Sequence, residues 1–158
     1  MKPIVLKPNF LKQIILWSFV VVGTCAGAAA ANCTTDPIVT GAALDTLING
    51  NLVCGSPGAA YPGGASSDRW QEEHLSSRQL WDYKLGPGNA VDPRAQVGTW
   101  SIANDKITHT YTDGTAFTWD VRQSPMSRNI YSFCAGAAEH VRAVIVANGG
   151  AGCGGMFP

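Results

Sequence analysis

An alternation of apolar and polar residues between positions 97 and 121 is the feature that most constrains this chain. Segments 106–112 and 115–121 each place apolar or aromatic side chains at every second position, with mostly threonine and charged residues between them. Asp113-Gly114 separates the two segments and is typical of a hairpin turn, and an earlier turn is expected at 103–105. This period of two predicts consecutive antiparallel strands with one face on a core.

The meander begins with a short extended segment at 101–102, and further extended segments flank the meander at 52–55, 69–75, 79–85, 130–134 and 141–147. Before them, Leu44, Leu47 and Ile48 form one apolar stripe, which predicts a short helix over 42–48. The sequence therefore predicts a mainly β fold of about eight strands. This fold is an antiparallel meander forming a small barrel or curved sheet, with one short N-terminal helix and two disulfides. The expected core residues are Trp100, Tyr111, Phe117, Trp119, Phe133, Val144 and Ile145.

The first 31 residues have the pattern of a cleaved secretory signal peptide. Three lysines precede an apolar stretch at 14–22, and small residues at 29–31 supply an Ala-x-Ala cleavage site. This divides the chain into a leader, 1–31, and a single exported β domain, 32–158. The expected location is the periplasm or the extracellular space, with no transmembrane segment in the mature form.

A second interpretation of the leader concerns Cys25. This cysteine follows Val22-Gly23-Thr24, a loose match to a bacterial lipoprotein box. Lipidation there would anchor the protein to the outer membrane.

Four cysteines remain in the expected mature chain, and an even number in an exported domain predicts two disulfides. Three pairings are possible. Local pairing, Cys33–Cys54 and Cys134–Cys153, is preferred because each bond closes a loop of about 20 residues and contributes roughly 3 kcal/mol. No Cys-x-x-Cys or paired histidine spacing is present, so spacing predicts neither a metal site nor a cofactor.

Charge excludes some partners. The chain has 11 basic and 11 acidic residues, and removal of the three leader lysines leaves an excess of three acidic residues. Without a basic stripe, nucleic acid is not an expected partner. The expected partner is an unidentified small ligand or an envelope protein.

The densest ionisable cluster lies on the predicted hairpin 69–85 and contains Glu72, Glu73, His74 and Asp82. One interpretation is catalysis or metal binding by Glu72, His74 and Asp82, which could act in acid–base chemistry. The other interpretation, which the sequence favours, is a solvated hairpin face with cross-strand charge pairs.

Aromatic residues and one histidine supply the candidate ligand-binding set: Trp70, Trp81, Tyr83, His109 and Tyr111. They either line a cavity for an apolar or sugar-like ligand or simply fill the core. On the second hairpin strand, Trp81 and Tyr83 form the apolar face and are expected to point to the core. His109 is expected on the core-facing side of its strand.

Two resemblances to known groups of proteins accompany these patterns. Gly98-Thr99-Trp100 is similar to the Gly-x-Trp signature of lipocalin-like (calycin) barrels, although it lies in the middle of the domain and not on its first strand. The motifs 70–74, 79–84, 97–101 and 131–134 resemble a group of small exported proteobacterial proteins. That resemblance implies an exported, disulfide-bonded β domain and no particular activity.

Three functions are compatible with these features. The first is a non-enzymatic binding or interaction protein of the bacterial envelope. The second is a small periplasmic hydrolase or metal-dependent enzyme that uses the hairpin cluster. The third is an envelope structural or assembly subunit that pairs through an edge strand.

Overall fold

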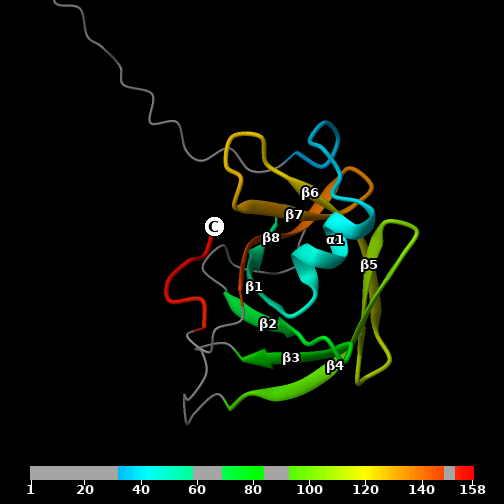
Figure 1. The fold of residues 1–158 in the computed structure, drawn as a ribbon, viewed down its shortest axis with the longest axis vertical. Helices are drawn as coiled ribbons and strands as arrows, with labels where there is room; N and C mark the ends of the chain where they lie inside the picture. Colours follow the sequence, from blue (N-terminus) through cyan, green and yellow to red (C-terminus); the bar gives the residue numbers. More distant parts are fainter. Residues whose placement is uncertain (1–31, 59–68, 84–92, 148–151) are drawn as a thin grey trace, which may run out of the picture.

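The predicted strands close into an antiparallel barrel in the computed structural model of the protein (Figure 1). The structure describes residues 32–58, 69–83, 93–147 and 152–158, so the predicted leader and Cys25 lie outside the described residues. Within that part of the chain the elements are α1 (Gly41–Ile48), β1 (Asn51–Pro57), β2 (Trp70–His74), β3 (Gln79–Tyr83), β4 (Ala95–Ala103), β5 (Lys106–Tyr111), β6 (Ala116–Gln123), β7 (Ile130–Ala135) and β8 (Ala138–Ala147).

Each strand pairs with the next one in the sequence, and β1 also pairs with β8. This last pairing joins Asn51 to Ala147 at one end and Pro57 to Val141 at the other, so it runs along all of β1. Among the described strands, the closed ring leaves no unpaired edge, and an unpaired edge is the usual site of sheet-to-sheet aggregation. The predicted meander is confirmed, and of its two expected forms the barrel is the correct one.

The turn between β4 and β5 explains how the central meander reverses direction. Ala103 pairs with Lys106, so only Asn104 and Asp105 lie between the strands. Both residues have positive φ, 51° and 59°. Two left-handed residues are what the twist of a two-residue hairpin requires, and asparagine and aspartate adopt this conformation most readily after glycine.

Strands β4 and β5 approach each other closely at Gly98. A Cβ atom at this position would lie 2.2 Å from the carbonyl oxygen of Thr110. The glycine of the Gly-x-Trp sequence is therefore required by strand packing. Two residues later, Trp100 points into the barrel and donates a hydrogen bond from Nε1 to the carbonyl of Leu75, at 3.0 Å.

The barrel interior is filled by a cluster of buried side chains: Leu44, Ile48, Val53, Trp100, Ile107, Trp119, Val121, Phe133, Val141 and Ala143. The expected core is confirmed for Trp100, Trp119 and Phe133. It is wrong for Phe117, which is 45% exposed, and for Val144, which packs against a second cluster outside the barrel. Phe117 shows that period two does not reveal how far along a strand the core extends. Val144 points away from the interior because it neighbours Ile145 on β8, and Ile145 packs against the interior cluster as expected.

Helix α1 contacts one end of the barrel. Leu44 and Ile48 are fully buried within the interior cluster, and each contributes about 1.5–3 kcal/mol through burial. Polar contacts fix the helix to the turns at that end. Asp45 forms an ion pair with Arg78 in the β2–β3 turn, and the carboxylate of Asp105 in the β4–β5 turn accepts a hydrogen bond from the amide of Gly41.

The disulfides join Cys33 to Cys134 and Cys54 to Cys153, so the expected local pairing is wrong. The local preference considered only loop closure in the unfolded chain. In the folded chain, Cys54 lies on β1, in a buried cluster with Cys153 of the C-terminal tail, and the N-terminal arm reaches β7. The two disulfides indicate an oxidising compartment.

The second cluster lies outside the barrel, beneath the C-terminal tail. It contains Leu52, Cys54, Tyr83 and Cys153, and the tail residue Phe157 packs against it.

Among the described residues, no helix has both the length and the hydropathy needed to cross a membrane.

Candidate functional site

The site is formed by residues from two strands that are not neighbours in the sheet. Strand β2 contributes Glu72 and His74, and β5 contributes His109 and Tyr111. Because alternate residues of a strand point to the same face, each strand presents its pair to the barrel interior. Strands β3 and β4 separate β2 from β5 along the sheet, so these side chains meet inside the barrel.

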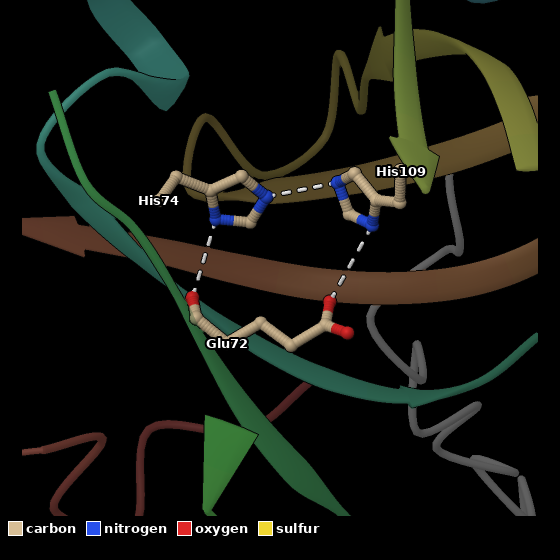
Figure 2. Close-up of side chains that lie close together, drawn as sticks. All are labelled: Glu72, His74 and His109. Atoms are coloured by element: carbon tan, nitrogen blue, oxygen red, sulfur yellow. Dashed lines mark hydrogen bonds and ion pairs between the residues drawn. The ribbon is translucent and has the colours of Figure 1, made fainter. Parts of the chain in front are cut away.

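Two imidazole rings lie at the centre of the site, as Figure 2 shows. The Nε2 atoms of His74 and His109 are 2.9 Å apart, and Nδ1 of His74 is 3.2 Å from the backbone oxygen of Glu72. Nδ1 of His109 faces the Glu72 carboxylate at 3.8 Å. All three residues are buried, with exposed fractions of 7% for Glu72, 0% for His74 and 2% for His109.

Neighbouring donors hold the Glu72 carboxylate in place. The hydroxyl of Tyr111 donates a hydrogen bond to Oε1 at 2.8 Å, and the Trp70 side chain also donates to this carboxylate. Trp70 lies directly against Gly55 of β1, where a Cβ atom would be 2.7 Å from the indole ring. Tyr111 and Trp70 therefore fix the orientation of the Glu72 carboxylate, and Gly55 leaves the space that the Trp70 ring occupies.

Burial controls the charge of the site. Desolvation raises the pKa of Glu72 to about 7, and the nearby charge of Asp82 acts in the same direction. Desolvation lowers the pKa of His74 to about 3. The pKa of His109 is well below its ordinary value, because of burial first and then the proximity of His74. These shifts favour the neutral pair of Glu72 and His109 over the ion pair.

The contacts also determine where the hydrogens lie. A carbonyl oxygen only accepts, so Nδ1 of neutral His74 carries its hydrogen and Nε2 keeps a lone pair. Nε2 of His109 therefore donates to Nε2 of His74, which leaves Nδ1 of His109 as an acceptor. That nitrogen is buried without a hydrogen-bond partner. The site thus presents unused ligand capacity inside the barrel.

The arrangement fits a metal ion. One ligand atom from each of Glu72, His74 and His109 can be chosen so that all three lie within 4.8 Å of one another. Two nitrogens 2.9 Å apart can both bind one ion at the usual distance of about 2.1 Å, provided that the hydrogen of His109 moves from Nε2 to Nδ1 when the ion binds. A histidine that donates its other ring N–H to a backbone carbonyl, as His74 does, has the support typical of metal-ligating histidines.

The favoured interpretation of the hairpin cluster, a solvated face, is wrong. Glu72, Glu73 and His74 are all buried. Asp82 is the cross-strand partner of Glu72 and so lies on the same face of the sheet. Glu73 points to the other side, where it binds Arg94 and the hydroxyl of Tyr83.

The candidate ligand-binding residues divide into two groups. Trp70, His109 and Tyr111 face the interior, and His109 contacts Trp119 with ring centroids 5.0 Å apart. Trp81 and Tyr83 lie outside the barrel, the first beneath the guanidinium of Arg94 and the second in the outer cluster. The expectation that these two residues point to the core of the barrel is wrong. Tyr83 is buried in the outer cluster and Trp81 is covered by Arg94, so a covered outer face produces the same apolar pattern as an inward face.

The pairing of His109 with Glu72 and His74 was not predicted from the sequence. The two histidines are 35 positions apart, and no short motif spans that separation. The available signal was their position: His74 and His109 both lie on the inward register of their strands. To recognise the site, one must know the order of the strands around the barrel as well as the alternation of faces along each strand.

The metal-free protein is expected to lose stability as the pH falls below about 6.5. Both histidines take up protons more readily in the unfolded chain than in the barrel, so each favours unfolding from pH 6.5 downward. Glu72 has the opposite effect between its ordinary pKa of 4.5 and about 7, because the folded form holds its proton more tightly. Between pH 6.5 and 4.5 the unfolded chain therefore binds one more proton than the folded chain, two at the histidines less one at Glu72. The free energy of unfolding should fall by about 1.4 kcal/mol for each pH unit.

Urea unfolding at pH 7, 6 and 5, with chelator present, measures this slope. The His140→Gln variant is the control, because His140 lies on β8 outside the cluster, and it should keep the same slope. A free energy of unfolding that stays constant between pH 6.5 and 4.5 would contradict the assigned neutral histidines.

Comparison of the chain with family models, with curated proteins and with solved structures gave no match. The functional interpretation therefore rests on the geometry of the site.

Proposed function

We propose that this protein is a non-enzymatic binding protein that holds a divalent transition-metal ion inside its barrel. The ligands are Glu72, His74 and His109. The observation that carries the proposal is the convergence of these three buried groups, whose ligand atoms lie within 4.8 Å of one another.

The cost of burying these groups supports the proposal. Polar and ionisable side chains in an apolar interior destabilise a fold unless they are fully paired. The rest of the interior cluster is apolar or aromatic, and one ring nitrogen of His109 lacks a partner. A bound cation would be ligated by Nδ1 or Nε2 of His109. It would also favour the charged form of Glu72, which burial otherwise disfavours.

The chemistry of the ligands narrows the choice of ion. Imidazole suits zinc, copper, iron and nickel, whereas an all-oxygen site would suit calcium or magnesium. Two imidazoles with one carboxylate therefore favour a first-row transition metal such as Zn²⁺. The cysteines do not compete, because all four in the described chain form disulfides.

Export to the periplasm or the extracellular space is part of the proposal. It is supported by the signal-peptide pattern of residues 1–31 and by the two disulfides. Lipidation at Cys25 is the alternative form of attachment. The resemblance to small exported proteobacterial β proteins is consistent with both.

Metal binding is tested with the chelator-stripped chain and Zn²⁺ or Co²⁺, by equilibrium dialysis and elemental analysis. We expect one ion per chain and, at a free concentration 100 times the dissociation constant, stabilisation by about 2.7 kcal/mol. His109→Gln should weaken binding by at least about 100-fold, because it removes a ligand. His140→Gln is the matched control and should bind as the wild type does. No stoichiometric ion, or equal loss in both variants, would refute the proposed site.

A further inference from the structure

The proposed ligand set leaves a charge to be balanced. A divalent ion with one carboxylate and two neutral imidazoles has a net charge of +1. Glu72, His74 and His109 are all buried, and an uncompensated charge in such a place is strongly unfavourable. Such a site either takes an anion from solution or has a second carboxylate nearby.

Asp82 is placed to supply that charge. It lies directly across from Glu72 in the β2–β3 pairing, and Leu80 lies across from His74 in the same register. Opposed residues of antiparallel strands share a face and have Cβ atoms about 4.5–5.5 Å apart. Glu72 and His74 point inward, so this face of β3 points inward too; Leu80 is fully buried, and one oxygen of Asp82 is also buried.

Two carboxylates directly across from each other are unfavourable when nothing positive lies between them. Glu72 and Asp82 form such a pair in the β2–β3 register. The described donors to Glu72, Tyr111 and Trp70, are both neutral. A cation beside Glu72 would convert this repulsion into attraction.

Other carboxylates of the described residues have different roles. Glu73 pairs with Arg94 on the outer face, and Glu139 pairs with Arg142. Asp120 pairs with Lys106, and Asp45 pairs with Arg78 beside the helix. None of these four is the cross-strand partner of a proposed ligand.

We infer that Asp82 is the charge-neutralising partner of the ion held by Glu72, His74 and His109, so that the loaded site is neutral and closed to anions from solution. This inference rests on the proposed metal site. Asp82 is a positioning residue, since its carboxylate is not among the three groups that converge. The role explains why an acidic residue occupies an inward position directly across from Glu72.

The experiment uses Co²⁺ as the metal and sodium azide as the anion, followed by visible absorption of the Co²⁺-loaded chain. We expect azide to leave the wild-type spectrum unchanged. In Asp82→Asn we expect Co²⁺ affinity to fall by about 10- to 100-fold and azide to shift the spectrum. Asp82→Glu should restore insensitivity to azide. Asp120→Asn is the matched control, because it removes the same charge from an outward position.

The outcomes separate this inference from the metal site itself. A wild-type chain that gives no Co²⁺ bands refutes the proposed function. A wild-type chain that binds Co²⁺ and also responds to azide refutes the role of Asp82 alone, and this measurement decides the matter even if Asp82→Asn does not fold. Unchanged affinity and unchanged azide response in a folded Asp82→Asn variant would also refute it.

Discussion

Replacement of Gly98 by alanine is expected to destabilise the barrel by about 3 kcal/mol and to lower the melting temperature by about 10 °C. The new Cβ would lie 2.2 Å from the carbonyl oxygen of Thr110. The opposing atom belongs to the backbone, so relief requires β4 and β5 to move apart. Thermal unfolding followed by circular dichroism measures the effect.

Gly136→Ala provides the control for this prediction. Gly136 has a φ of 61° in the β7–β8 turn, and a Cβ there would meet nothing within 4 Å. It carries only the cost of a left-handed alanine, about 1–2 kcal/mol. A Gly98→Ala variant that is as stable as Gly136→Ala would show that the close approach is absent in solution.

Removal of the disulfide between Cys33 and Cys134 is expected to destabilise the protein more than the Gly98 substitution does. The cysteines are 101 positions apart, and in the chain-entropy model a loop of about 100 residues contributes about 4.7 kcal/mol. The double variant Cys33→Ser with Cys134→Ser removes this constraint from the unfolded chain. Guanidinium unfolding at fixed pH measures the loss.

The second disulfide supplies the comparison. Cys54 and Cys153 are 99 positions apart, so their double serine variant should lose a similar amount through the unfolded chain. A difference in the free energy of unfolding between the two double variants would measure the packing contacts that the cysteines make in the folded protein. A loss below about 1 kcal/mol in both, or a Cys33–Cys54 peptide in a non-reducing digest, would contradict the assigned pairing.

The strands and the helix could be predicted from the sequence because their signals are local. Period two identified β5 and β6, and the stripe of Leu44, Leu47 and Ile48 identified α1. The closure of the ring follows from pairing between β1 and β8, which no local pattern specifies. The disulfide pairing was wrong for the same reason, since it depends on where the chain ends lie after closure.

The site was predicted only in part. Glu72, His74 and Asp82 were identified as a cluster, and His109 was placed on an inward face, but as separate features. Their meeting depends on β2 and β5 facing each other across the interior. Trp81 and Tyr83 were assigned to the wrong side, because an outer surface covered by Arg94 or by the tail selects aromatic residues as an inner surface does.

The pairing of the first strand with the last determines the order in which the protein can be completed. A ribosome makes β1 before β8, so β1 cannot gain its β8 partner until the chain has been made as far as Ala147. The two cysteines of each disulfide are about as far apart in the sequence as the paired residues of β1 and β8. Such long-range closure slows folding relative to local hairpins. The hairpins from β2 to β7 can therefore form before β8 is available, whereas ring closure cannot, and each disulfide must wait for its second cysteine.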